Sequence, residues 1–207
     1  MTVFTGYVGA SGDDGSGTED MNFDNSATTM QSGFDSTSME KYQIWVRIPS
    51  VTVPQGSTVV ASSNCRLFLY ANAAGSGSNN GSFSITLRGV DADNASAPTD
   101  ETELYGGSAA PTFTSATDNG QWNNDTGEDS TVSQGWVDVS LNDVVHEIVN
   151  RPGWTSGNAI VLFVTYEGDE SEDEDVYFRT YDYTGTTYHP YVKIDYTAPA
   201  GSDAVPM

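Results

Sequence analysis

The sequence predicts an all-β protein: a single jelly-roll-like antiparallel β-sandwich with one short helix at about residues 141–150. The apolar segments are short, several of them alternate with polar residues, and the spacers between them are rich in Gly, Ser, Asn, Asp and Thr. A chain of 207 residues is also long enough to bury one sizeable core. We expect residues 1–40 to add edge strands and loops to this domain, residues 41–197 to form the sandwich, and residues 198–207 to form a tail.

The alternating segments place the expected strands in order along the chain. They are residues 41–48, 58–70, 83–87, 136–139, 158–166, 176–181 and 191–196, with edge strands at 1–8 and near 21–23. In the first of them Ile44 and Val46 share one face and Trp45 lies on the other. The segment 158–166 is apolar at successive positions, which predicts a strand buried on both faces near the middle of its sheet.

The one expected helix begins after a capping-box pattern. Ser140 stands at the N-cap position, with Asp143 three residues later. Apolar residues then recur on one helical face, at Leu141, Val144, Val145 and Ile148.

The four residues after the helix are predicted to be architectural. Arg151 tethers a loop, Pro152 and Gly153 end the helix, and Trp154 covers the core where the chain turns back.

Charge excludes two classes of partner. There are 29 acidic and 7 basic residues, and the formal net charge is -22. Binding to nucleic acid or to anionic lipid requires a basic surface, so both are excluded. At molar salt the Debye length falls to roughly 3 Å, so the self-repulsion of such a chain is screened. With 11% aromatic residues the chain is too apolar for a disordered acidic segment, and the composition predicts a halophilic source.

The composition also predicts a chain without disulfides or membrane spans. Cys65 is the only cysteine and alternates with Leu67 and Leu69, which predicts a small buried side chain. No apolar run reaches bilayer length, and no basic-then-apolar signal follows Met1, so we expect neither membrane insertion nor export by a signal peptide.

Three blocks resemble a known family. They are "IWVRIPSVTVPQGSTVVASSNCRLFLYA" (44–71), "GVDADNASAPT" (89–99), and the segment from "WVDVSLNDVVHEIVNRPGWTSGNAIVLFV" (136–164) to "PYVKIDY" (190–196). Their order and spacing resemble the DNRLRE-type, disaggregatase-related jelly-roll modules, which are similar to carbohydrate-binding modules. The resemblance covers roughly residues 40 to 197 and implies the fold. Such modules occur on secreted enzymes, on surface proteins, and in structural proteins of tailed phages and halophilic viruses.

Catalytic motifs are absent from the sequence, and we expect no enzyme activity. His146 and His189 are far apart and start no metal-ligand pattern, and no nucleophile elbow or phosphate-binding glycine loop occurs. A structural Ca²⁺ or Mg²⁺ ion is the one expected cofactor, with Asp91 and Asp93 as its ligands. The alternative is that these acids are hydrated in a loop.

Aromatic residues on outward faces or in loops are the candidates for glycan or partner contact. They are Trp45, Tyr105, Trp122, Tyr181, Tyr183 and Tyr188. The alternative is packing against neighbouring loops. Three N-glycosylation sequons, at Asn80, Asn94 and Asn124, fall in expected loops.

The function expected from these observations is a non-enzymatic structural protein of a halophilic tailed virus particle, as capsid decoration, turret, fibre or tail component. Its partners would be copies of itself and other virion proteins, with cell-surface glycans as a further partner. It would be located in the virion, assembled in the host cytoplasm. The alternative is a carbohydrate-binding surface module of a halophilic microbe. Solvent-facing aromatic residues clustered in one groove would favour glycan binding, and aromatic residues dispersed under the termini and long loops would favour subunit contacts.

Overall fold

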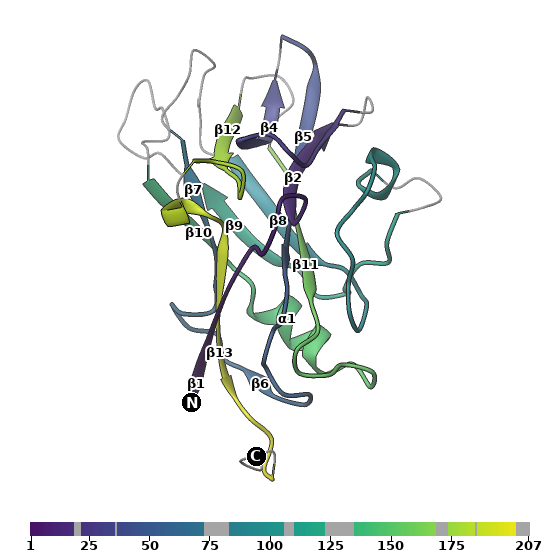
Figure 1. Ribbon diagram of the computed structural model, residues 1–207, viewed down its shortest axis with the longest axis vertical. Helices are drawn as coiled ribbons and strands as arrows, with labels where there is room; N and C mark the ends of the chain where they lie inside the picture. The colour runs from purple at the N-terminus through teal and green to yellow at the C-terminus, as the bar shows by residue number, and fades with distance from the viewer. Residues whose placement is uncertain are drawn as a thin grey trace.

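The structure is a computed structural model that describes residues 1–18, 22–35, 37–72, 83–105, 110–122, 135–168, 174–184 and 186–201. These residues form one curled antiparallel sheet of 13 strands with a single α-helix, α1 (Asn142–Val149) (Figure 1). The strands are β1 (Thr2–Tyr7), β2 (Asp14–Thr18), β3 (Phe23–Asp24), β4 (Thr29–Asp35), β5 (Glu40–Ile48), β6 (Thr58–Val59), β7 (Arg66–Ala71), β8 (Phe83–Gly89), β9 (Asp118–Trp122), β10 (Gly135–Ser140), β11 (Ile160–Tyr166), β12 (Glu174–Arg179) and β13 (Tyr191–Thr197). Two 3₁₀ turns, η1 (Glu101–Glu103) and η2 (Thr186–Tyr188), lie in the loops.

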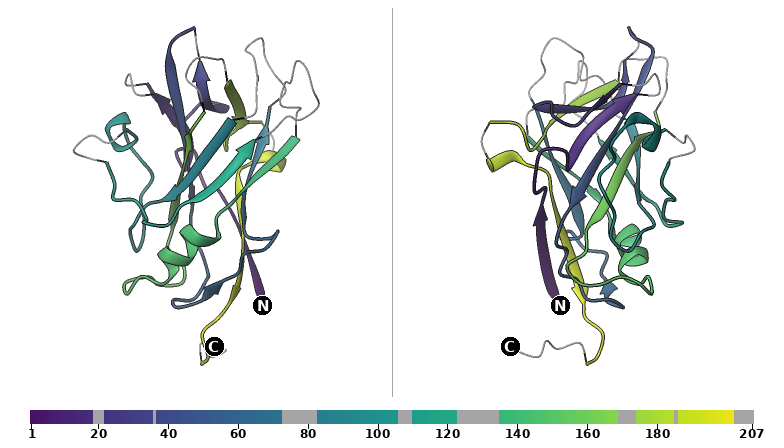
Figure 2. Two further views of the ribbon diagram at one scale, coloured as in Figure 1. Left: turned by 180° about the vertical axis from the view of Figure 1, so that it is seen from behind. Right: turned by 45° about the vertical axis from the view of Figure 1, so that its right-hand side comes forward.

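The sheet curls until two layers face each other, which confirms the predicted all-β sandwich. The strand order is β1-β13-β7-β12-β4-β5-β11-β8-β9, with β10 on the second edge of β7 and β2 paired to β5. The layer of β1, β13, β7 and β10 covers that of β5, β11 and β8 (Figures 1 and 2). Leu67 and Leu69 of β7, Val192 and Ile194 of β13, and Leu162 and Val164 of β11 all belong to one buried cluster. The main core is therefore the space between these layers.

The central strand is β11, as the sequence predicts. It pairs with β5 on one edge and β8 on the other, and six of its seven residues are buried. Its even-numbered residues enter the main core, whereas Val161 and Phe163 enter a second, smaller cluster.

The prediction that Trp45 lies on an outward face is wrong. Trp45 does point away from the main core, but it is fully buried in the second cluster with Val161, Phe163 and Leu104. Phe23 stacks on its indole with ring centroids 4.7 Å apart. The chain between β8 and β9 folds over this side of β5 and β11. The face of these strands that points away from the main core is therefore buried as well.

Two other strand predictions differ from the structure, and strands such as β4 and β9 have no counterpart among the predicted ones. The segment 58–70 divides into β6 and β7, because the chain turns at 62–65, where the N–H of Cys65 donates to the carbonyl of Ser62. Residues 1–40 are more than an edge, since β4 lies inside the sheet between β12 and β5. Neither β4 nor β9 has a clear apolar alternation, and main-chain pairing with their neighbours holds both.

The helix α1 covers one end of the main core, with Val144, Val145, Ile148 and Val149 buried. It begins after Leu141, and Ser140 does not cap it: the Ser140 hydroxyl bonds the side chain of Asn142 instead. The carboxylate of Asp118, on β9, accepts the N–H groups of Asp143 and Val144 at 3.0 and 3.1 Å. The capping oxygen thus comes from a distant strand. None of the helices in the described ranges has the length and apolar character of a membrane span.

Asp118→Ala should lower the free energy of unfolding by about 1–2 kcal/mol, because two N–H groups at the start of α1 lose their acceptor. Ser140→Ala is the comparison: the Ser140 hydroxyl bonds Asn142 and contacts the Asp118 carboxylate without accepting a helix N–H, so its loss should cost less, about 0.5–1 kcal/mol. Urea unfolding at constant molar salt measures both. Equal losses, or a larger loss for Ser140→Ala, would return the capping role to Ser140.

Candidate functional site: an aromatic face

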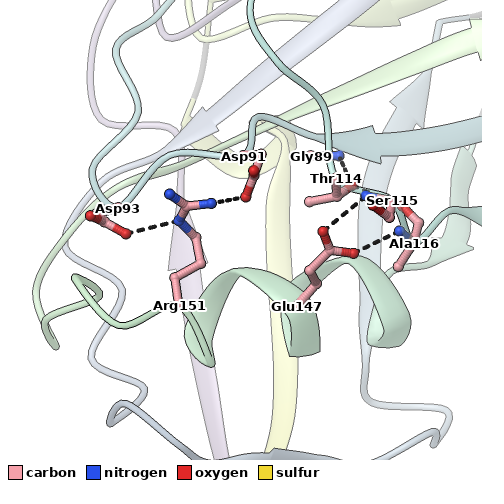
Figure 3. Close-up of polar contacts among 8 residues, drawn as sticks. All are labelled: Gly89, Asp91, Asp93, Thr114, Ser115, Ala116, Glu147 and Arg151. Carbon is pink, nitrogen blue, oxygen red and sulfur yellow. Dashed lines mark hydrogen bonds and ion pairs between the residues drawn. The ribbon is translucent and has the colours of Figure 1, made fainter.

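The Arg151 side chain lies between the two acids expected to bind a metal. Its Nε donates to Asp93 Oδ1 at 2.8 Å, and its Nη1 pairs with Asp91 Oδ1 (Figure 3). One turn earlier on α1, Glu147 accepts the N–H groups of Ser115 and Ala116 at 2.9 and 2.7 Å (Figure 3). Both ends of the chain between β8 and β9 are therefore tied to α1 and the residues just after it, and Arg151 tethers this loop as predicted.

This ion-pair cluster changes the interpretation of Asp91 and Asp93. A guanidinium now supplies the positive charge that the Ca²⁺ or Mg²⁺ prediction assigned to a metal. Among the described residues, no group of three or more His, Cys, Asp or Glu side chains is placed to hold a metal ion. Both acids therefore have a cationic partner within the fold, and a Ca²⁺ or Mg²⁺ ion beside them stays a prediction.

The rest of the Arg151–Trp154 segment also acts in the fold. A Cβ on Gly153 would meet Asp93 Oδ2, so this turn needs glycine for the close approach of the acid. Trp154 is 2% exposed, packs in the main core and donates from its indole N–H to the carbonyl of Val53 at 2.9 Å. Pro152 is exposed, and its carbonyl accepts from the Gln55 amide.

The predicted contact residues Tyr105 and Tyr181 are partly buried and engaged within the fold. The Tyr105 hydroxyl lies 2.8 Å from the carbonyls of Gly17 and Lys41 and holds the η1 loop on the sheet. The ring of Tyr181 packs beside His189 with centroids 4.8 Å apart. The side chain of Trp122 lies outside the described residues.

Tyr183 and Tyr188 surround a buried cation. The Arg179 guanidinium lies 4.0 Å from the ring centroid of Tyr183, 4.3 Å from that of Tyr188 and 4.6 Å from that of Tyr70. Cation–π attraction is strong at such distances when water is excluded. Arg179 therefore fixes the turn after β12 against β7.

This cluster is one end of a larger surface, which we call the aromatic strip. It consists of Tyr7 (β1), Phe68 and Tyr70 (β7), Trp136 (β10), Tyr188 (η2) and Tyr191 (β13). Strand register puts Tyr7, Tyr191 and Phe68 in one row and Tyr70 opposite Trp136. The rings touch in sequence: Tyr7 to Tyr191 at 5.3 Å, Tyr191 to Phe68 at 4.6 Å and to Trp136 at 5.1 Å, Trp136 to Tyr70 at 5.2 Å, and Tyr70 to Tyr188 at 4.3 Å.

The aromatic strip is open to solvent and bordered by cations. Tyr7 is 55% exposed and Trp136 is 42% exposed. Lys193 Nζ lies 5.5 Å from the ring centroid of Phe68, and Arg66 pairs with Asp138 at 2.6 Å beside it. With Arg179, three of the 7 basic residues of the chain therefore adjoin this surface. Burial raises the pKa of the Tyr191 phenol, with the charge of Asp138 adding to the effect, so this ring stays neutral.

Sequence reasoning missed most of the aromatic strip. The alternation that places Leu67 and Leu69 in the core also places Phe68 and Tyr70 on the outside, so the signal was present within β7. What alternation could not show is that β13 and β10 flank β7 and bring Tyr191 and Trp136 to the same face.

A polar pocket opens on another part of the sheet, among β2, β3, β4 and β12. It has a volume of about 330 Å³, and its lining includes Asn22, Gln31, Tyr42 and Tyr177. Glu40 accepts from Asn22 and from the Tyr42 hydroxyl at 3.1 and 2.8 Å. The two carboxylates at its border, Glu40 and Asp175, thus hold its amide and phenol groups in place, since Gln31 donates to Asp175 at 2.6 Å.

The remaining titratable groups of note are buried in the fold. Asp14 Oδ2 accepts the N–H of Tyr181 at 2.9 Å, and Asp14 Oδ1 has no hydrogen-bond partner among the described residues. Burial raises the pKa of Asp14 to about 7, and the charges of Asp182 and Asp13 add to this effect. Cys65 is fully buried, as predicted, and burial raises the pKa of its thiol to about 11.

Within the part of the chain that the structure describes, the two histidines and Asn94 do not form a further site. His146 is exposed on α1, and burial lowers the pKa of His189 beside Tyr181. Asn94 accepts the N–H of Ala159 at 2.8 Å, while Asn80 and Asn124 lie outside the described residues.

Comparison with known proteins assigns no family to this chain. A scan against protein-family models matches none, and a search of curated proteins finds no relative.

Trp154→Ala should lower the free energy of unfolding by about 3–5 kcal/mol, as large aromatic truncations in cores do. Trp154→Phe keeps most of the ring packing and loses only the bond to Val53, so it should cost about 1–3 kcal/mol. Denaturant titration at molar salt measures both variants. If Trp154→Ala unfolds with the wild-type midpoint, Trp154 does not close the core.

Asp14 should make stability fall as pH rises from about 4 to about 7. The folded state holds the Asp14 proton more tightly than the unfolded chain, where the pKa is near 3.8, so the favourable contribution is complete below pH 3.8 and lost through pH 7. At about 1.4 kcal/mol per pKa unit this contribution amounts to at most about 4 kcal/mol. The contribution of Asp14 is measured by comparing the unfolding free energies of wild type and Asp14→Asn across this pH range at constant salt. Parallel curves for the two proteins would contradict it.

Proposed function

We propose that this protein is a non-enzymatic structural protein of a halophilic tailed virus particle and that it binds its neighbours through the aromatic strip. The observation that carries the proposal is the strip itself: six aromatic side chains in mutual contact on an open sheet face of a chain whose formal net charge is -22. Buried Asp14 and the Arg151 cluster, by contrast, hold the fold together.

Exposed aromatic groups favour contact with another protein. Contiguous apolar patches on soluble proteins mark interaction surfaces, and Tyr, Trp, Phe and Arg are the residues enriched at the centres of such interfaces. Phe68 and Tyr191 stand parallel, with 6° between their planes, so each covers the face of the other. A ring face covered in this way cannot stack on a sugar, which favours contact with a packed protein surface.

The charges around the aromatic strip indicate what kind of partner fits. Lys193 places a positive charge beside Phe68, whereas Arg66 is paired with Asp138 and Arg179 is buried among the tyrosine rings, so this face lacks the excess negative charge of the whole molecule. An acidic surface, the kind that proteins adapted to high salt carry, is electrostatically complementary to it. Neighbouring subunits of a halophilic particle would have such surfaces, and molar salt would screen the remaining repulsion.

The virion setting is supported by two sequence features. The acidic, lysine-poor composition is suited to high salt, and the resemblance to DNRLRE-type modules links the chain to structural proteins of tailed phages and halophilic viruses. A sandwich serves this purpose well because its loops and faces vary while the core stays constant.

The polar pocket favours a second candidate function, binding of a neutral carbohydrate. Its amide and phenol groups are held in place by Glu40 and Asp175, and its volume of about 330 Å³ suits a small ligand. The clustering of solvent-facing rings on one face also agrees with glycan binding. A carbohydrate-binding surface module is therefore the alternative.

Added at molar salt to gradient-purified particles from its source, the wild-type protein should co-sediment with them. Trp136→Ala should reduce the bound fraction by about tenfold or more, because it removes the ring that joins Tyr70 to Tyr191. Met39→Asn is the matched control: it removes a side chain that is 69% exposed in the β4–β5 turn, and binding should not change. A glycan array in the same buffer should give no signal. A protein that stays free of particles and binds one polysaccharide class would replace this proposal with the second candidate.

A further inference from the structure

The outer edge of β1 has no partner strand among the described residues. β1 ends the strand order and pairs only with β13 (Figure 2, right). The N–H of Val8 donates to the carbonyl of Pro190, so even-numbered residues bond toward β13. In an antiparallel pair the main-chain groups of alternate residues point away from the partner. The N–H and C=O groups of Val3, Thr5 and Tyr7 therefore point outward.

Nothing in β1 protects this edge against pairing. Natural edge strands are blocked by charged side chains, proline or bulges. β1 (TVFTGY) has none of these, and residues 1–12 contain no Asp, Glu, Lys or Arg, although the whole chain has 29 acidic and 7 basic residues. Its Val, Phe, Thr and Tyr residues also favour the strand conformation. The outermost strand therefore carries no charged side chain that would oppose a second strand.

We propose that β1 pairs antiparallel with β1 of a second copy of this chain, about a two-fold axis at Thr5. The pairing joins the two sheets into one and continues the aromatic strip across the seam. It deepens the proposed function and rests on it for its setting, whereas the pairing itself follows from the strand.

The register follows from the outward groups. With the axis at Thr5, Thr5 faces Thr5 of the other copy, and Val3 faces Tyr7 in both directions, so all three outward residues form hydrogen-bonded pairs. An axis at Phe4 would place Tyr7 opposite Met1, and an axis at Gly6 would leave Val3 without a strand partner. The Thr5 axis alone uses the full strand.

The side chains fit this register. Val3 is 47% exposed and Tyr7 is 55% exposed, and they are the two large apolar groups on the outer face of β1. Directly opposite aromatic and β-branched side chains, and opposite threonines, are favourable cross-strand pairs. The pairing would cover both exposed groups at once.

The charges behind the seam do not oppose it. Thr5 is in register with Lys193, the cation nearest the seam, and Lys193 is in register with Arg66, whose charge is balanced by Asp138. The acid of the adjoining row, Asp195, is buried and accepts from Ser62 at 3.0 Å. A second copy can therefore approach along β1 without bringing exposed acids together, whereas the net charge of -22 repels it from other directions.

A contact of one short strand is weak. We expect a dissociation constant of roughly tens to hundreds of micromolar at molar salt, since the interface is below the size of stable complexes. On a particle with many copies held close together, the effective concentration would make such a contact persist.

The register is tested by disulfide trapping with Thr5→Cys at molar salt. The Cα atoms of a hydrogen-bonded antiparallel pair lie about 5.5 Å apart, within the range for a disulfide. Thr2→Cys is the control on the same strand, because in this register the two Thr2 Cα atoms lie about 20 Å apart. Native Cys65 is fully buried and should not react. Mild oxidation should trap most of Thr5→Cys as a dimer and little of Thr2→Cys. Equal trapping of the two, or none of Thr5→Cys, would overturn the register and with it the proposal.

The hydrogen bonds are tested by light scattering over a concentration series. Thr5→Pro removes an N–H that points away from β13, so the β1–β13 pairing is retained, and circular dichroism verifies the fold. The wild-type mass should rise toward the dimer with concentration, Thr5→Val should behave like wild type, and Thr5→Pro should remain monomeric. A monomer at all concentrations, or a dimer that Thr5→Pro leaves intact, would overturn the proposal.

The same variants distinguish a failure of the β1 pairing from a failure of the proposed virion function. A Thr5→Pro monomer that still co-sediments with particles is consistent with both proposals. A wild-type monomer that binds particles overturns only the self-pairing, and a wild-type dimer that ignores particles overturns only the virion function.

Discussion

The burial of β11 on both faces is the constraint on which the rest of this structure depends. A strand whose successive residues are all apolar needs a cover on each side. The layer of β7 and β13 supplies one cover, and the chain between β8 and β9 supplies the other. Glu147 of α1 and Arg151 just after it tie the two ends of this chain in place (Figure 3). Gly153 and Trp154 then turn the chain back toward β11. The densely patterned stretch from α1 to β11 is the part of the sequence that organises both cores.

Three of the few cations in this chain join segments of the fold that are distant in sequence. Arg47 pairs with Asp13 at 2.8 Å and bonds the carbonyl of Ala95, so it joins the start of β2 to the cover of the second core. Arg151 joins the helix end to the loop after β8, and Arg179 holds three tyrosine rings together. Each of these cations links segments distant in sequence. In a molecule with formal charge -22 such contacts are favourable, because each brings a positive charge into a negative field.

The aromatic strip and the edge of β1 form one continuous surface. Tyr7 belongs to both, because its ring contacts Tyr191 while its main chain faces outward from β1. Pairing at the edge would therefore lengthen the strip without changing it, and the strip would remain available to another partner. This geometry suits a protein that is repeated on a large assembly, where one contact joins copies and a second contact joins those copies to the particle.

The sequence by itself determined the fold class, the central strand, the helix and the structural part of Arg151 to Trp154, because these depend on local periodicity and turn chemistry. Strand alternation also separated Phe68 and Tyr70 from the core residues beside them. Only the tertiary structure decided what lies beyond each face. Trp45 is outward in its strand and still buried, since a distant loop covers it. Asp118 caps a helix whose cap the sequence assigned to Ser140, and Asp91 and Asp93 both pair with Arg151. The aromatic strip exists because four strands from the beginning, middle and end of the chain are neighbours, and such neighbours are set by long-range packing that no local pattern records.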